Sequence, residues 1–248
     1  MSEKIVGIIG GMGPAASASL YWNIVRLTPV NKDQGHFRVV MDSNPGIPDR
    51  TAAIEGRGVS PVQYIIQTGK NLELLGATVG AMPCITAHYY YEEIHRALSY
   101  QLLNALEELK KYIMLKYPGT MKIGILATTG TVNSRLFDRY LPQQLLYPGP
   151  HLQEKYVMEA VYGINGIKRG NTGEHPRRLL QWAGEELIQK GAQILVAGCT
   201  EIPLALSAKN IATPLLDVIE ILARALIEFP EPSRPQPRHN GDCGDFSI

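Results

Sequence analysis

Short apolar runs alternate with helical patterns along most of the chain. Two such runs, KIVGIIGGMGP from Lys4 and MKIGILATTGT from Met121, contain β-branched residues and stop at loops of small residues. Apolar residues at helical spacing follow each of them, in AASASLYWNIVRLT (residues 15–28) and VNSRLFDRYLPQQL (residues 132–145). Alternating strands and helices predict parallel strands joined by right-handed crossovers, and therefore an α/β fold.

One segment of this pattern occurs twice, since residues 61–84 align with residues 176–199 without a gap. Each copy starts with a proline, which suits a first helical turn, and continues with apolar residues at helical spacing. A glycine then ends the predicted helix, and a strand and a cysteine follow. The identical pairs are Pro61 and Pro176, Gly69 and Gly184, Leu72 and Leu187, Gly76 and Gly191, Ala77 and Ala192, and Cys84 and Cys199.

The repeat predicts two similar halves, residues 1–117 and 118–229, in a pseudo-two-fold arrangement in which the last helix could pack back on the first half. Open α/β sheets place ligand-binding residues at the carboxyl ends of their strands, where both cysteines lie. If the two parallel sheets face each other across a cleft, Cys84 and Cys199 form its opposite walls. Residues 230–248 are rich in proline and are predicted to be extended or disordered, and Cys243 there is given no catalytic role.

Composition narrows the class of protein. The 248 residues are 45% hydrophobic and 19% charged, with a net charge of +1, which suits a globular chain and offers no basic surface for nucleic acid or a membrane. No apolar window approaches the length of a membrane span, and the first residues lack the apolar core of a secretory signal. Three cysteines are too few for a disulfide scaffold, so we expect a cytoplasmic protein.

Two facing thiols suit proton transfer to and from carbon. A thiolate is a good base, and a thiol is a usable acid because its pKa of about 8.5 lies near working pH. A thiolate on one face of a tetrahedral carbon could remove its proton while a thiol on the other face returns one, which inverts the centre. The residues after Cys84, ITAHYYYEEIHRAL, are predicted to be helical, and a helix N-terminus would favour a thiolate and a substrate carboxylate.

Other interpretations of these residues are weaker. His88 lies four positions after Cys84 and could form a metal site or a Cys–His pair, but no CxxC or HExxH motif accompanies it, so a structural histidine is the default. The glycines of GIIGGMG do not have the spacing of a dinucleotide-binding loop.

Four motifs in order, GGMGP, NPGIPDRT, PCITAH and GCTEIP, resemble the aspartate/glutamate racemase family, and aspartate racemases most of all. The resemblance covers about residues 4–229. It implies two flavodoxin-like halves, one active-site cysteine from each half (Cys84 and Cys199), no pyridoxal phosphate, no metal and a homodimer. It also implies a small-molecule partner, an acidic amino acid.

The resemblance also assigns substrate-binding positions. Met12 and Gly13 would line the pocket, Arg50 would pair with the side-chain carboxylate with help from Asp49 and Thr51, and Lys168 matches a substrate-binding lysine. Thr86, Thr128 and Thr131 would lie near the α-carboxylate. Thr200 and Glu201 would orient the amino group.

Ile85 departs from the family pattern, in which an asparagine follows the first cysteine. Losing one hydrogen bond to a charged group costs about 1.5–3 kcal/mol, so Ile85 would weaken binding or alter the substrate. We therefore expect a cofactor-independent racemase that interconverts L- and D-aspartate. The alternatives are glutamate, hydantoin or maleate chemistry on the same scaffold, or an amino-acid-binding protein without catalysis.

Overall fold

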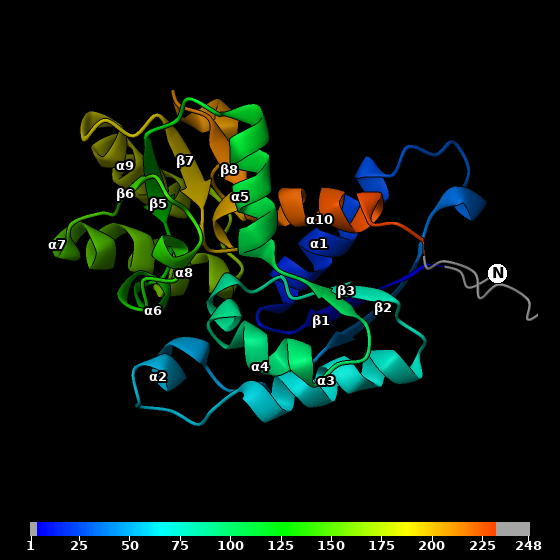
Figure 1. Ribbon diagram of the computed structural model, residues 1–248. Coiled ribbons are helices and arrows are strands. Elements are labelled where there is room, and N and C mark those ends of the chain that lie inside the picture. Colours follow the sequence, from blue (N-terminus) through cyan, green and yellow to red (C-terminus); the bar gives the residue numbers. More distant parts are fainter. Residues whose placement is uncertain (1–3, 232–248) are drawn as a thin grey trace, which may run out of the picture.

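The protein, seen as a computed structural model that describes residues 4–231, contains two four-stranded parallel sheets (Figure 1). The first sheet has the strand order β2–β1–β3–β4 and the second β6–β5–β7–β8, so the two halves share one topology. The α/β fold with two similar halves is therefore confirmed. The strands are β1 (Ile5–Gly10), β2 (Arg38–Ser43), β3 (Val79–Ala81), β4 (Gln101–Leu103), β5 (Lys122–Leu126), β6 (Gln144–Leu146), β7 (Ile194–Ala197) and β8 (Leu215–Asp217).

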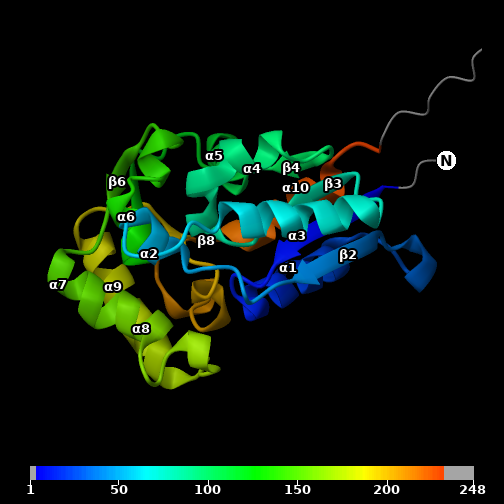
Figure 2. The ribbon, with the colours of Figure 1, turned by 90° about the horizontal axis from the view of Figure 1, so that it is seen from below.

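Helices connect the strands and cover the sheets (Figures 1 and 2). The α-helices are α1 (Pro14–Leu27), α2 (Arg50–Ile54), α3 (Val62–Leu74), α4 (Tyr91–Arg96), α5 (Ala105–Lys116), α6 (Thr129–Asn133), α7 (Pro150–Leu152), α8 (Glu159–Tyr162), α9 (Glu174–Gln189) and α10 (Val218–Glu228). A π-helical segment, Gln153–Met158, joins α7 to α8. Short 3-10 helices are Asp33–Gly35, Ile85–Tyr90, Phe137–Arg139, Ile167–Arg169, Ile202–Leu204 and Ala208–Asn210.

The sequence repeat has matching local geometry in the two halves. Gly76 and Gly191 have φ angles of 82° and 95°, the left-handed region that glycine adopts without strain. In each copy the N–H after the glycine donates to a carbonyl five residues back, Ala77 to Leu72 and Ala192 to Leu187, both at 3.0 Å. These bonds close the C-terminal turns of α3 and α9 and direct the chain into β3 and β7.

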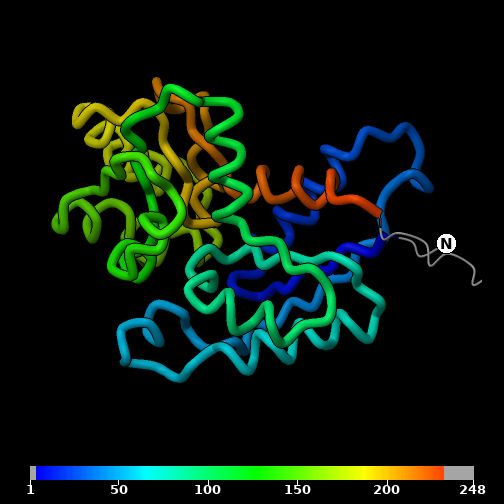
Figure 3. The backbone as a smooth tube through the Cα atoms, in the orientation of Figure 1, coloured from blue at the N-terminus to red at the C-terminus, as the bar shows by residue number. Residues whose placement is uncertain are grey.

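The two halves share part of their core. One cluster of buried apolar residues joins the first sheet, the second sheet and α10, with Val6, Ile125 and Leu222 among its members. Helix α10 follows the last strand of the second half but packs against α1 and α5, as Figures 1 and 3 show. Lys4 binds the C-terminal end of α10, since its Nζ donates to the carbonyls of Ile227 at 2.8 Å and Phe229 at 2.7 Å.

Two secondary-structure expectations needed correction. A continuous helix over residues 132–145 was wrong: α6 ends at Asn133, Arg135 has a φ of 52°, and only the short 3-10 helix Phe137–Arg139 follows. The positive φ breaks the helical path, while the apolar residues that suggested a helix are buried in the shared core. The segment after Cys84 begins as a 3-10 helix, Ile85–Tyr90, and becomes α-helical only at Tyr91.

The proposed boundary between residues 117 and 118 falls between α5 and β5. The predicted disorder of the proline-rich tail and the position of Cys243 concern residues that lie, from 232 onward, outside the described part of the chain.

Candidate active site

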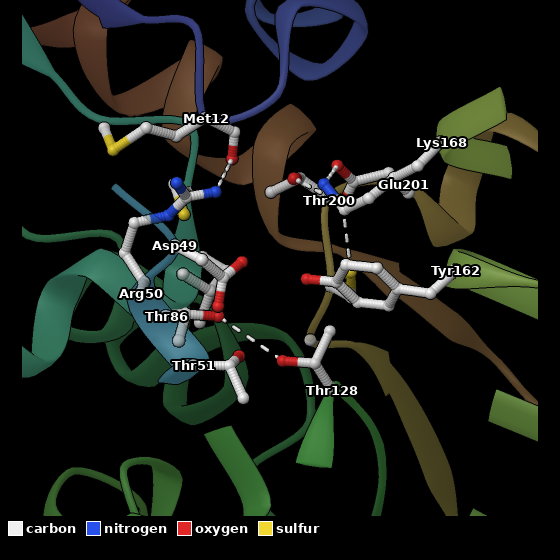
Figure 4. A pocket seen from close by; sticks show the side chains of 14 residues that line it. Met12, Asp49, Arg50, Thr51, Thr86, Thr128, Tyr162, Lys168, Thr200 and Glu201 are labelled. Atoms are coloured by element: carbon white, nitrogen blue, oxygen red, sulfur yellow. Dashed lines mark hydrogen bonds and ion pairs between the residues drawn. The ribbon is translucent and has the colours of Figure 1, made fainter. Parts of the chain in front are cut away.

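Cys84 and Cys199 line one cleft between the two halves. Cys84 follows β3 and Cys199 follows β7, so each thiol lies just beyond the carboxyl end of a central strand. Both are nearly buried, with 6% and 7% of their surface exposed. Side chains of both halves line this cleft. Figure 4 shows its side chains, with labelled residues of the first half on one side and those of the second half on the other.

Most of the residues expected from the sequence lie on this cleft. They are Met12, Asp49, Arg50, Thr51, Cys84, Ile85, Thr86, Thr128, Lys168, Cys199, Thr200 and Glu201. Gly13 lines an open cleft directly outside, which shares Asp49, Arg50, Tyr162, Lys168 and Glu201 with the inner one. Thr131 lies behind Thr86 and Thr128 and is bonded to both.

Tyr162 and Gly198 also line the cleft, and no motif in the sequence pointed to them. Tyr162, at the end of α8, projects its ring into the cleft beside Thr128 in Figure 4, and the Lys168 ammonium lies 5.3 Å from the ring centre. An isolated tyrosine at the end of a short helix carries no motif that would have identified it. Gly198 precedes Cys199, and a Cβ atom there would meet the Phe137 ring at 2.7 Å, so only glycine fits this turn.

The Cys199 thiol lies in an acidic, buried environment. Its Sγ is 2.9 Å from Glu201 Oε2, which also accepts a hydrogen bond from Thr200 Oγ1 at 3.2 Å. Burial and the Glu201 carboxylate together raise the pKa of the Cys199 thiol well above its ordinary value. At neutral pH this cysteine is therefore a thiol and a proton donor.

Glu201 is held in its charged form. Burial would raise the pKa of Glu201, but Lys168 and the Cys199 thiol hold it below its ordinary value. Lys168 Nζ lies 2.5 Å from Glu201 Oε1, with 24% of the lysine side chain and 5% of the glutamate side chain exposed. Burial opposes the charge on Lys168, but Glu201 outweighs it and raises the pKa of the lysine.

Arg50 provides a cation on the opposite wall. Its Nη1 donates to the carbonyls of Pro48 at 2.9 Å and Ile47 at 3.2 Å, and Nη2 is 3.5 Å from the Met12 carbonyl oxygen. Burial opposes its charge, but the neighbouring Cys84 and Asp49 raise the pKa of Arg50. Among residues 4–231 its buried Nε has no hydrogen-bond partner, and the guanidinium lines the cleft as a cation that can pair with an anionic ligand.

Asp49 has a structural contact as well as a place on the wall. Its Oδ1 accepts a hydrogen bond from the Ala52 backbone N–H at 2.8 Å and caps α2. This contact directs the start of α2, and with it Arg50 and Thr51, at the cleft.

Three threonine hydroxyls meet where the halves touch. Thr86 Oγ1 of the first half lies 2.8 Å from Thr131 Oγ1 and 3.4 Å from Thr128 Oγ1 of the second, and the latter two are 3.2 Å apart. Each hydroxyl can donate one proton, so the group can turn donors toward a carboxylate.

His88 is a structural residue. It is 2% exposed, its Nδ1 lies 3.0 Å from the Cys84 carbonyl oxygen, and its Nε2 accepts the Ala105 backbone N–H at 3.1 Å. Because a backbone N–H only donates, Nδ1 carries the proton of a neutral ring. The expectation of a structural histidine is confirmed.

Ile85 contributes apolar surface. It is 2% exposed, belongs to the shared core and also lines the cleft, so it supplies no polar group to a ligand.

Within residues 4–231, no helix has the length and apolar character needed to cross a membrane. In that same range, no three His, Cys, Asp or Glu side chains gather closely enough to hold a metal ion.

Comparison with known proteins identifies the family. The chain is 30% identical to an aspartate racemase from Picrophilus torridus, with a TM-score of 0.76 over 90% of this chain and 93% of that one. It is 27% identical to the broad specificity amino-acid racemase RacX of Bacillus subtilis (strain 168), over 90% of this chain and 96% of RacX.

A glutamate racemase from Francisella tularensis has the same fold, with a TM-score of 0.63 at 16% identity over 91% of this chain and 80% of that one. The model of the Asp/Glu/hydantoin racemase family matches residues 9–226. The chain therefore belongs to the Asp/Glu/hydantoin racemase family.

Proposed function

We propose that this protein interconverts L- and D-aspartate by moving the α-proton between Cys84 and Cys199, without a cofactor. The observation that carries the proposal is the position of the two thiols, which follow equivalent strands of two similar halves and line one cleft. The matching family model describes Asp/Glu/hydantoin racemases, and two thiols can supply the base and the acid that inversion requires.

The step conserves atoms and charge once one cysteine is a thiolate. One cysteine, as a thiolate, takes the α-proton, and the electron pair of the broken C–H bond stays on the α-carbon and its carboxylate. The other cysteine gives its thiol proton to the opposite face. The reverse reaction exchanges their roles, so a pseudo-symmetric site suits two nearly mirror-image reactions.

The surrounding groups suit a substrate with two carboxylates. The threonine hydroxyls at the contact between the halves would bind the α-carboxylate through donated protons. The Arg50 guanidinium and the Lys168 ammonium, which both line the cleft, would bind the side-chain carboxylate. Glutamate has the same two carboxylates with one more methylene between them, so it is the nearest alternative substrate.

The deciding experiment follows L-aspartate in D2O by NMR and chiral chromatography. We expect α-deuterium in the product and formation of D-aspartate. Cys84→Ala and Cys199→Ala should each lower the rate of inversion by at least about 100-fold, because each removes an acid–base group. Cys243→Ala is the matched control and should keep the parental rate.

Racemisation at the parental rate by both single-cysteine variants would refute the mechanism. The same assay over a panel of acidic and neutral amino acids tests the choice of aspartate, and faster exchange of another amino acid would replace it. Activity after dialysis against a chelator and a carbonyl reagent tests independence from metal and pyridoxal phosphate.

We also propose that the protein forms homodimers. Light scattering after size-exclusion chromatography measures the mass directly, and a single 27.3 kDa species would contradict this.

A further inference from the structure

Glu201 connects two groups that the proposed reaction treats as separate. Its Oε1 bonds to Lys168 Nζ at 2.5 Å, and its Oε2 bonds to Cys199 Sγ at 2.9 Å. One buried carboxylate therefore touches both a residue assigned to the substrate side chain and a residue assigned to proton transfer.

The ion pair lies at the border of the catalytic cleft. Lys168 and Glu201 line both the inner cleft and the open cleft outside it. A Cβ atom on Gly13 would lie 3.3 Å from Glu201 Oε1 and 3.6 Å from Lys168 Nζ, so the first half closes over the pair. Lys168, Cys199 and Tyr162 interact electrostatically with Glu201, and Asp49, Arg50 and Cys84 line the same cleft.

Cys199 needs a proton acceptor. A thiol can take a proton from carbon only if its own proton leaves, and the hydrogen-bond acceptor of this thiol is Glu201. While the Lys168 ammonium is paired with Glu201, the carboxylate is a weak base, because an opposite charge nearby stabilises its ionised form.

We propose that Glu201 is the terminal proton acceptor for Cys199, and that a side-chain carboxylate bound by Lys168 makes Glu201 basic enough for this role. This inference rests on the proposed Cys84/Cys199 mechanism. A substrate carboxylate shares the charge of Lys168 and so weakens its hold on Glu201. The side chain of the substrate then controls the rate of proton transfer as well as affinity.

The proposed step conserves atoms and charge. The α C–H bond breaks and its proton moves to Cys199 Sγ, while the thiol proton of Cys199 moves to Glu201 Oε2. The electron pair stays on the α-carbon and its carboxylate. The Cys84 thiol gives a proton to the opposite face and remains as a thiolate, and the reaction from the other enantiomer runs through the same steps in reverse.

The test compares L-aspartate with L-alanine, whose side chain offers Lys168 no acceptor. Rates of α-proton exchange in D2O are measured from pH 5 to pH 10 for the parental protein, Lys168→Met, Glu201→Gln and the double variant. Lys209→Met, an exposed lysine away from the cleft, is the control and should leave all rates unchanged.

We expect Lys168→Met to raise the KM for aspartate and to raise kcat for alanine by on the order of tenfold at alkaline pH, because Glu201 loses its counter-charge. The acid limb of kcat should move to higher pH by about one unit or more. Glu201→Gln should lower kcat for both amino acids by about 100-fold and remove that limb, and the double variant should show no gain with alanine.

A plain substrate-binding lysine gives a different result, which would overturn the inference: KM for aspartate rises, kcat for alanine is unchanged or lower, and the acid limb stays in place. Lys168→Gln, which keeps a neutral donor, repeats the test if Lys168→Met does not fold. Failure of the proposed function is seen separately, as parental rates in both single-cysteine variants or no exchange by the parental protein.

Discussion

At the scale of single residues, His88 shows how burial turns a titratable group into a pH-dependent element of stability. Burial lowers its pKa to about 4, and protonating Nε2 would place a second donor against the Ala105 N–H. The unfolded histidine has a pKa of about 6.5, so between these pH values the unfolded state binds more protons. The contribution of His88 to the free energy of unfolding is therefore complete above pH 6.5 and is lost as the pH falls through 4.

We expect the free energy of unfolding to decrease by about 3 kcal/mol through His88 alone as the pH falls from 7 to below 4. Urea denaturation at a series of pH values measures this. His88→Gln is the matched variant, because its amide can donate to Cys84 and accept from Ala105 without titrating. A pH dependence as steep as that of the parental protein would show that His88 is not its source.

At the level of secondary-structure elements, the glycines after α3 and α9 set the direction of β3 and β7, the strands that lead to the cysteines. At Gly191 an added Cβ atom would meet no atom closer than 3.5 Å, so a methyl group fits and only the φ of 95° opposes it. We expect Gly191→Ala to lower the free energy of unfolding by about 1–2 kcal/mol, measured by urea denaturation.

Gly119→Ala is the control for this substitution. Gly119 does not have a positive φ, and a Cβ atom there meets nothing within 4 Å. It should leave stability unchanged or raise it slightly, because alanine restricts the unfolded chain. Equal losses at both glycines would contradict the role of the left-handed turn.

At the scale of the whole molecule, the site depends on how closely the halves approach. Gly130 in α6 of the second half lies against Thr51 in α2 of the first, two helices that also lie together in Figure 2. A Cβ atom on Gly130 would lie 2.6 Å from Thr51 Oγ1 and Cγ2, so alanine must push the halves apart.

We expect Gly130→Ala to lower kcat/KM for racemisation by about 100-fold, since a displacement of about 1 Å misaligns the acid and the base. The cost in stability should stay within about 1–3 kcal/mol. Gly149→Ala, where a Cβ atom meets nothing within 4 Å, should change neither quantity. Parental kcat/KM in Gly130→Ala would show that the approach of the halves does not limit catalysis.

Features encoded by neighbouring residues could be predicted from the sequence, and features set by tertiary packing could not. Helix α1 and the repeated helix–strand segments followed from apolar spacing and glycine position, because these signals are local in the chain. The broken segment over residues 132–145 did not, since its apolar residues face the shared core in spite of the positive φ of Arg135. Tyr162 was missed because its side chain enters the cleft only through the tertiary position of α8.

Periodicity, turn glycines and motifs are properties of neighbouring residues, so the α/β fold, the two similar halves and the pair of cysteines could be predicted from the amino-acid sequence. Only the folded chain brings Lys168 to Glu201, Thr86 to Thr128 and Thr131, and Gly130 to Thr51. These contacts join segments far apart in the chain, and their geometry depends on how the shared core brings the two sheets together.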